Sequence, residues 1–380
     1  MPNALHRAPL LAGLLLPATL LAQAVPERTP RPLSRDGMVE HEETFSRIKS
    51  VMALPDGRVV VPDATEKKLM LLDFATQRAV QLARSGSGPK EYQTPGGVYR
   101  SRQGGVVVYD QQQRRFLPIL ANGTVGDAIA LPFSPTSVSV NDRGPDQFVP
   151  DTLGNVLSQV TSRGAGAIET RLVRYNSRGT EHEVAELTSA ASRELPGSDA
   201  RVVMRQLVRF SPADVWAVAP DGWTVVLSAA PYQARWIPPS GNAVQGAVLP
   251  FTALPVTKAD RDAAKAASSN RPPATVSIGG SGGERISPIR PPNTEPLFAD
   301  TKPAFPVHVP SFDPLGRVWV ERHVVQGAPL VYDVIDRRGA VVDRIQFPAR
   351  TRLAGFGTGV LYVVHTDEDD LLHVQRYRMP

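Results

Sequence analysis

The sequence predicts an all-β fold, a six-bladed β-propeller of four-stranded blades, on three observations. A glycine turn followed by a short apolar strand recurs six times, at Gly57, Gly104, Gly154, Gly222, Gly316 and Gly359. The period of roughly 40–50 residues is typical of propellers and solenoids. The 380 residues include 36 prolines and 30 glycines, as expected of many short strands joined by turns.

The first 24 residues are predicted to be a signal peptide rather than part of the fold. His6 and Arg7 precede an apolar run from Leu10 to Leu21, which ends at the small-x-small site Ala22-Gln23-Ala24. The run is short for a membrane span, although an uncleaved anchor is the alternative. We therefore expect export to the periplasm or beyond, a mature chain without a transmembrane segment, and a flexible leader at 25–36.

Alternation and β-branched residues predict the strands of each blade within a propeller domain at 37–380. The predicted blade ranges are 48–83 for the first, 97–131 for the second, 137–187 for the third, 203–249 for the fourth, 307–347 for the fifth and 353–378 for the sixth. The sixth blade contains only three strand patterns. An open ring would leave a strand edge unpaired, so we expect Met38–Phe45 to complete this blade beside Leu371–Arg378.

An insertion is predicted at about 252–303, between the fourth and fifth blades. Thr257 to Asp260 reads as a capping box and predicts a short helix that continues to Ala267. The stretch at 268–293 is rich in glycine, serine and proline, which is typical of a flexible loop. Because long loops on a rigid scaffold often carry function, the insertion is a candidate lid.

One segment carries a family resemblance. Residues 84–98 resemble the Gly-x-Gly-Pro-x-Glu-aromatic-x-x-Pro link between the first two blades of exported bacterial six-bladed propellers of the NHL-repeat and TolB-like type. The matching residues are Gly86, Gly88, Pro89, Glu91, Tyr92 and Pro95. The resemblance covers about residues 46–112 and implies the fold. It does not select a function, because such families contain binding proteins and a few enzymes.

Polar residues that follow the second strand of five of the six predicted blades, and two of their neighbours, are the candidate site; the third blade has Val160 at this position. We expect them to surround one mouth of the central channel. The candidates are Asp63, Asp110, Ser228, Glu321, Arg322, His323 and His365. A structural alternative stands beside each: the aspartates could bind their own turns, the link motif could fix blade packing, and the histidines could be solvated.

Several chemistries are excluded or disfavoured. The chain has no cysteine, which excludes disulfides, thiol catalysis and cysteine zinc sites. The net charge of +5 is scattered along the chain, so no nucleic-acid partner is expected. No nucleophile-elbow or zincin motif is present. Lactonase-like propellers hold calcium through Glu, Asn and Asp. The six ring positions here are Asp63, Asp110, Val160, Ser228, Arg322 and His365, which offer two aspartates and neither Glu nor Asn; Glu321 and His323 are only their neighbours.

The sequence therefore favours an exported, monomeric propeller that binds an unidentified protein or small-molecule ligand. The alternative is a lactonase-like hydrolase or lyase that uses a polar channel mouth in which calcium is possible. A purely structural envelope protein is a third hypothesis. The sequence leaves the enzyme question open, because no catalytic motif decides it.

Overall fold

The structure, a computed structural model, describes residues 27–133, 148–163, 168–195, 204–269 and 295–380. The predicted signal peptide at 1–24 and most of the predicted loop at 268–293 lie outside these residues. Within the described part of the chain, no helix is both long and apolar enough to span a membrane.

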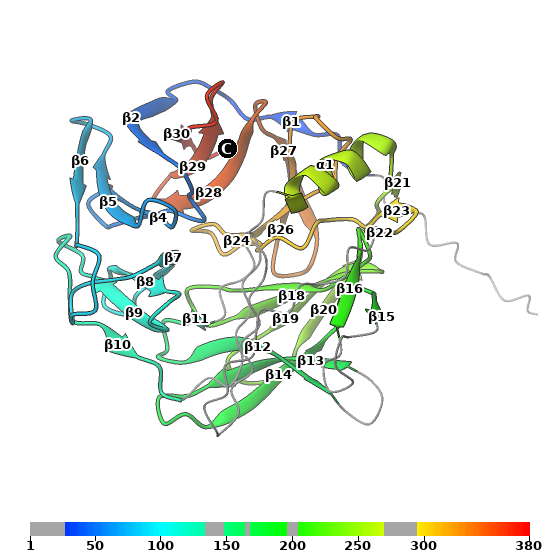
Figure 1. The fold of residues 1–380 in the computed structure, drawn as a ribbon, viewed down its shortest axis with the longest axis horizontal. Helices are drawn as coiled ribbons and strands as arrows, with labels where there is room; N and C mark the ends of the chain where they lie inside the picture. The colour runs from blue at the N-terminus through cyan, green and yellow to red at the C-terminus, as the bar shows by residue number, and fades with distance from the viewer. Residues whose placement is uncertain (1–26, 134–147, 164–167, 196–203, 270–294) are drawn as a thin grey trace, which may run out of the picture.

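The chain is an all-β fold of small, mostly four-stranded sheets that surround a common centre, as the blades of a β-propeller do (Figure 1). The first sheet contains β3 (Met52–Ala53), β4 (Val59–Asp63), β5 (Lys68–Asp73) and β6 (Arg78–Gln81). The second contains β7 (Pro95–Arg100), β8 (Val106–Asp110), β9 (Arg115–Ile119) and β10 (Ile129–Ala130). The third contains β11 (Val149–Pro150), β12 (Val156–Arg163), β13 (Ile168–Tyr175) and β14 (Glu181–Leu187).

The other three sheets complete the arrangement. The fourth contains β17 (Val215–Val218), β18 (Thr224–Ala229), β19 (Tyr232–Ile237) and β20 (Val244–Val248). The fifth contains β24 (Ser311–Phe312), β25 (Val318–Glu321), β26 (Val331–Ile335) and β27 (Val341–Gln346), with β1 (Arg31–Pro32) at its outer edge. The sixth contains β28 (Thr351–Gly357), β29 (Val360–Thr366), β30 (Leu372–Arg378) and β2 (Val39–Phe45).

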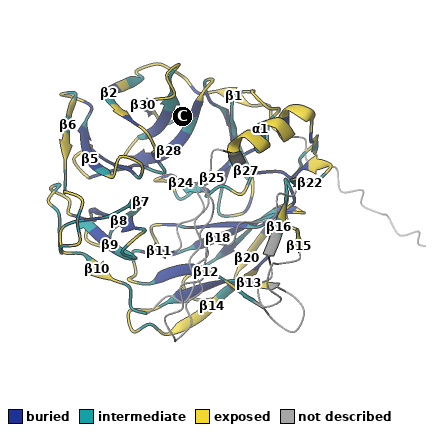
Figure 2. Cartoon of the chain, viewed as in Figure 1, coloured by how far each residue is buried: buried dark blue, intermediate teal, exposed yellow. Residues whose placement is uncertain are grey.

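Burial changes from the inner to the outer strands of a sheet. Every residue of β4 and β8 is buried, because both faces of these apolar strands are covered by neighbouring sheets. The outermost strands β6 and β20 are mostly exposed (Figure 2). The hydrophobic core therefore lies between sheets: Val59 and Val61 of the first sheet, for example, pack in one cluster with Tyr362 and Val364 of the sixth.

The predicted pairing of residues 38–45 with 371–378 is present. Strand β2 runs antiparallel to β30, with Val39 opposite Arg376 and Phe45 opposite Leu372. Phe45 is buried in the cluster between the sixth and first sheets. An early strand thus completes the sheet that is formed by the end of the chain.

The innermost strands of these two sheets also meet. The Val51 amide donates to the Ala354 carbonyl at 2.9 Å, and a Cβ added to Gly355 would overlap the backbone oxygen of Val51. At this close contact a methyl group can be admitted only if a backbone atom moves.

We therefore expect Gly355→Ala to lower the free energy of unfolding by about 1–3 kcal/mol. Urea denaturation measures this loss. Gly126→Ala is the control, since its Cβ would meet only Pro118 at 3.3 Å; equal losses in both variants would contradict the steric explanation.

Part of the predicted flexible leader is structured instead. Strand β1 runs parallel to β27, and the Leu33 amide donates to the Gln346 carbonyl at 2.8 Å. Leu33 is only 4% exposed, within the core cluster of the fifth and sixth sheets. The prediction of a flexible leader is therefore wrong for residues 31–33, because an apolar side chain and an unpaired strand edge attach them to the fifth sheet.

The insertion contains the predicted helix, α1 (Lys258–Ser269). Its capping box is formed: the Thr257 amide donates to Asp260 Oδ2 at 2.8 Å, and the Asp260 amide donates to Thr257 Oγ1 at 3.3 Å. The buried Asp260 also pairs with Lys302 Nζ at 2.6 Å. This ion pair ties the start of α1 to the short ladder of β21 (Leu254–Pro255) and β23 (Thr301–Lys302).

The prediction that the fourth blade begins near Val203 is wrong. Its innermost strand is β17, which starts at Val215. The preceding segment forms a hairpin of β15 (Ser192–Leu195) and β16 (Met204–Arg209), and β16 pairs in parallel with β22 (Leu297–Phe298) of the insertion. The residues before Val215 do form strands, but β16 pairs with β22, which is distant from it in sequence.

Candidate functional site

A cavity of about 440 Å³ lies where the six sheets meet. Its wall includes residues from the innermost strand of each of these six sheets, namely β3, β7, β11, β17, β24 and β28. A cavity of this size is within the range of small-molecule sites in proteins. The centre of the fold is therefore the candidate functional site.

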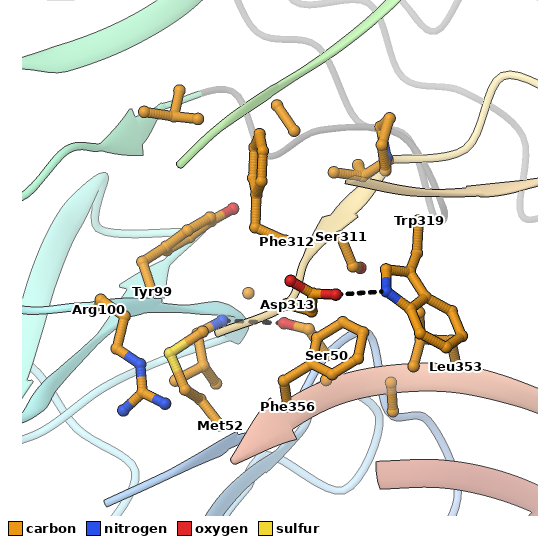
Figure 3. A pocket seen from close by; sticks show the side chains of 18 of the residues that line it. Ser50, Met52, Tyr99, Arg100, Ser311, Phe312, Asp313, Trp319, Leu353 and Phe356 are labelled. Atoms are coloured by element: carbon orange, nitrogen blue, oxygen red, sulfur yellow. Dashed lines mark hydrogen bonds between the residues drawn. The ribbon is translucent and has the colours of Figure 1, made fainter. Parts of the chain in front are cut away.

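Apolar and aromatic side chains supply much of the wall. Figure 3 shows Met52, Tyr99, Phe312, Trp319 and Phe356 around the hollow, contributed by four different sheets. Such a lining offers apolar area to a ligand, while a few polar groups fix its orientation.

A histidine and a glutamate form the chemically most distinctive pair in this wall. His308 precedes β24, and its Nδ1 lies 3.0 Å from Oε1 of Glu321 at the end of β25. Both side chains are largely shielded, with 24% and 11% exposure. Because a carboxylate only accepts, Nδ1 must carry the proton, which leaves Nε2 as the basic nitrogen of the neutral ring.

Tyr332 fixes the glutamate in turn. It lies directly opposite Glu321 in the β25–β26 ladder, and its hydroxyl donates to Glu321 Oε2 at 3.3 Å. The same hydroxyl accepts the Leu353 amide proton at 3.1 Å. The ladder register of the fifth sheet and a contact to the sixth thus orient the dyad of His308 and Glu321.

The two other carboxylates in the wall are engaged by their own turns. Asp313 accepts protons from the Leu315 and Arg317 amides, from Arg317 Nε at 2.6 Å and from Trp319 Nε1 at 3.0 Å (Figure 3). Asp151 accepts from the Leu153 amide and from both nitrogens of Asn155.

These engagements argue against a calcium site. Calcium requires six to eight oxygen ligands, several of them carboxylate oxygens. Asp151, Asp313 and Glu321 already satisfy other donors. Nor does any other group of three His, Asp or Glu side chains come together to hold a metal within the described residues. The residues of the cavity therefore do not fit the metal that the sequence left possible.

Of the seven candidate residues, Glu321 alone belongs to the cavity wall. Asp63 and Asp110 end the second strands β4 and β8 and are 0% and 1% exposed. Each carboxylate accepts backbone amide protons from two sides: Ser46, Arg47, Thr65 and Glu66 for Asp63, and Gln93, Thr94, Gln112 and Gln113 for Asp110. In both sheets the aspartate at the end of the second strand therefore binds the segment that leads into the first strand.

The other four candidates lie in separate environments. Ser228 lines a polar pocket on the surface with Asp214 and Arg235. His365 Nδ1 is 3.3 Å from Glu40 Oε2 at the junction of β2 with the sixth sheet. The prediction of one ring of these residues is wrong, because the innermost strands rather than the ends of the second strands surround the centre.

Arg322 belongs to a buried ionic cluster. Its NH1 and the Arg344 Nε bind opposite oxygens of Asp333, at 3.0 and 2.5 Å. The Tyr232 hydroxyl donates to Asp333 Oδ2 at 3.0 Å. Glu27 approaches both guanidinium groups at 3.4 and 3.5 Å, so the start of the described chain adds a second negative charge to this cluster.

His323 is held by a backbone carbonyl. Its Nδ1 is 2.8 Å from the Pro303 oxygen, and burial lowers the pKa of His323 to about 4. The unfolded chain takes up this proton near pH 6.5, whereas the folded protein does so only near pH 4. The free energy of unfolding should therefore fall as pH drops from 6.5 to 4, by no more than about 3 kcal/mol from this group.

Urea denaturation at several pH values tests this prediction. His323→Asn retains a side-chain N–H for the Pro303 oxygen but does not titrate in this range. The variant should lose less stability than the wild type between pH 6.5 and 4. Parallel curves for both proteins would show that His323 is not responsible.

The link motif packs the first two sheets together. The Gly88 amide donates to Glu91 Oε2 at 2.7 Å, and the Tyr92 hydroxyl donates to the Lys67 carbonyl at 2.9 Å. Tyr92 is fully buried. A Cβ on Gly86 would overlap the Glu91 carboxylate, so a larger residue there would displace this side chain. Pro89 accepts the Ala128 amide proton through its carbonyl, and Pro95 begins β7.

Three comparisons with known proteins leave the family open. No family model matches the chain, and no curated protein is similar to it in sequence. Regucalcin from Agrobacterium tumefaciens, described as calcium-binding, is 13% identical over 93% of this chain and 98% of its own, with a TM-score of 0.44. A protein assigned as a gluconolactonase is 11% identical over 91% and 94%, with a TM-score of 0.43.

A protein of Bacteroides fragilis that is assigned as exported is 9% identical over 92% of this chain and 95% of its own, with a TM-score of 0.47. At these identities and TM-scores the likenesses carry no argument. The fold and the function are therefore argued from this chain's own residues.

The sequence reasoning missed His308, Tyr332 and Arg100, which all line the cavity. One feature of the sequence could have identified two of these three residues. His308 and Arg100 lie in or beside the strand that precedes a repeat glycine, and this strand is the innermost of its sheet. Tyr332 carries no comparable signal, because only the register of β25 and β26 places it opposite Glu321.

Proposed function

We propose that the protein is an exported, closed six-bladed β-propeller that acts on a small organic molecule in its central cavity as a hydrolase or lyase. Six sheets whose innermost strands share one cavity support the blade number. The β2–β30 ladder supports closure. The charged, apolar and small-residue pattern at positions 6–24 supports export.

The dyad of His308 and Glu321 in the cavity wall is the observation that carries the enzymatic proposal. A carboxylate on Nδ1 orients an imidazole and stabilises its protonated form, while Nε2 transfers the proton. A histidine is well suited to this role near neutral pH. Glu321 ends a strand of the fifth sheet, and its carboxylate holds the imidazole of His308, which lies in the segment just before β24.

Two reactions fit this arrangement. In hydrolysis, His308 takes a proton from water as the water oxygen bonds to a carbonyl carbon, and returns it to the leaving oxygen as the C–O bond breaks. In elimination, His308 takes a proton from the carbon beside a carbonyl as the bond to a leaving group on the next carbon breaks, and then protonates that group. Each needs one proton-transfer residue and no metal.

A binding module without chemistry is the second candidate. The lack of a paired nucleophile favours it: among the described residues the His308 side chain hydrogen-bonds to Glu321 alone, while Ser50 Oγ accepts the Val98 amide proton at 3.0 Å (Figure 3). Covalent catalysis through Ser50 is therefore unsupported, and the enzymatic proposal depends on water or on substrate protons alone.

A turnover screen of the purified wild type separates the two candidates. Lactones, aryl esters and β-substituted carbonyl compounds are followed by proton release and by product analysis, and binding of the same compounds is measured by thermal shift. Turnover of at least one class supports the enzyme. Binding of several compounds without turnover of any supports the binding module.

A further inference from the structure

Three cationic side chains occupy one sector of the central cavity. Lys49 precedes β3 of the first sheet, Arg100 ends β7 of the second, and Arg352 lies on β28 of the sixth. Both arginine side chains donate hydrogen bonds to backbone carbonyls in or just before the first sheet. Arg100 NH1 donates to the Ala53 carbonyl at 2.6 Å, and Arg352 NH2 donates to the Ile48 carbonyl.

Arg100 lacks a carboxylate partner among the described residues. Its NH1 is bound to a neutral carbonyl, and burial lowers the pKa of its guanidinium. Arginine nevertheless remains charged in proteins. A shielded charge that is compensated only by a carbonyl is costly, and an anion bound in the cavity would neutralise it, because Arg100 lies in the cavity wall.

The carboxylates elsewhere in the wall do not neutralise this charge. Asp313 is satisfied by Arg317, Trp319 and two backbone amides. Glu321 is occupied by His308 and Tyr332. The guanidinium of Arg100 has five N–H donors, only its Nη1 is hydrogen-bonded within the described residues, and the side chain lines the cavity. A small molecule in the cavity can therefore reach it.

We propose that the ligand of the central cavity is an amphipathic organic anion whose carboxylate or phosphate group is bound by Arg100, with Lys49 and Arg352 beside it. Guanidinium groups bind both kinds of anion through charge-assisted, often bidentate hydrogen bonds. The apolar body of the ligand lies against Tyr99 and Phe312. Figure 3 places Arg100 beside Met52 at one side of the hollow. This inference rests on the proposed ligand-binding function of the cavity.

Matched probes test the inference by calorimetric titration. The probes are 4-phenylbutyrate, phenethyl phosphate and the neutral 4-phenylbutyramide, measured on the whole purified protein. At least one anion should bind the wild type tenfold or more tightly than the amide. Comparison of the carboxylate with the phosphate then identifies the anionic group. Equal binding of all three probes would overturn the inference.

Variants assign the preference to Arg100. Arg100→Gln removes the positive charge but keeps a polar side chain, and it should reduce the anion preference below threefold without changing the affinity for the amide. Arg100→Lys should keep part of the preference. Arg338→Gln is the matched control, because Arg338 is 85% exposed in a pair with Asp336. A preference that survives in Arg100→Gln overturns the inference. So does a large fall in its melting temperature without ligand, since Arg100 would then be structural.

The outcome is separable from that of the proposed function. Anion preference lost in Arg100→Gln, with no turnover of any substrate, supports the anion site and removes the enzymatic proposal. Turnover that depends on His308, with equal binding of anions and amide, removes the anion site and leaves the enzymatic proposal in place. If Arg100→Gln does not fold, the wild-type probe series and Arg100→Lys decide.

Discussion

Replacement of His308 by asparagine should lower turnover by about 100- to 10,000-fold, the contribution typical of a positioned acid–base residue. Asparagine retains an N–H near the position of Nδ1 for Glu321, so the local hydrogen bond at 3.0 Å is replaced rather than lost. Because the imidazole is partly exposed to the cavity, little packing is removed. We therefore expect the melting temperature and the affinity for ligands to change little.

Two further variants define the roles within the dyad. Glu321→Gln keeps the size of the side chain but cannot stabilise an imidazolium, so it should lower turnover less than His308→Asn does and shift the pH–rate profile. His365→Asn is the matched control, because His365 also faces a carboxylate, at 3.3 Å, but does not line the cavity. Full activity in His308→Asn, or equal losses in His308→Asn and His365→Asn, would remove His308 from the mechanism.

Replacement of Asp333 by asparagine should lower the free energy of unfolding by about 3–5 kcal/mol. Asp333 is fully buried and binds Arg322 and Arg344, which are 8% and 6% exposed. The isosteric amide removes the closer and fully buried of the two negative charges that contact the guanidinium groups, and presents a donor to them. Glu27 compensates only in part, because its oxygens lie 3.4 and 3.5 Å from the two arginines and it is itself more exposed.

Asp343→Asn is the matched control for this loss. Asp343 lies on the same sheet and pairs with Arg31 at 2.5 Å, but the two side chains are 23% and 48% exposed. Exposed pairs contribute at most about 1 kcal/mol. Chemical denaturation of both variants measures the difference. Similar losses would mean that burial of the Asp333 cluster does not determine its contribution to stability.

Local pattern predicted the strands well wherever their partners were close in sequence. The range expected for the first blade, 48–83, contains β3 to β6, because alternation, β-branched residues and a glycine turn at Gly57 act between neighbouring strands. The absence of a fourth strand in the last blade also predicted the ladder of β2 with β30. The capping box predicted α1 for the same local reason.

Contacts between distant segments were not predictable in this way. The leader carries no strong strand pattern, yet β1 adds to the fifth sheet and Leu33 enters the core. The fourth blade was predicted to begin near Val203 because the residues of β16 have a strand pattern. Local sequence does not show that β16 pairs with β22 of the insertion, because the two strands are far apart in the chain.

The candidate site likewise combines features that the local sequence predicts with contacts that only the tertiary structure determines. The sequence by itself determined the repeated strands and the glycine turns, since these depend on neighbouring residues. It left the structural role of Asp63 and Asp110 as an alternative, because half of the amides that each carboxylate binds lie 16 or 17 residues earlier. Only the tertiary structure decided that Glu321 meets His308, and that Arg100 stands beside a shared cavity without a carboxylate partner among the described residues. The physical reason is that the innermost strands of six sheets converge on one space, and no local pattern records which side chains face it.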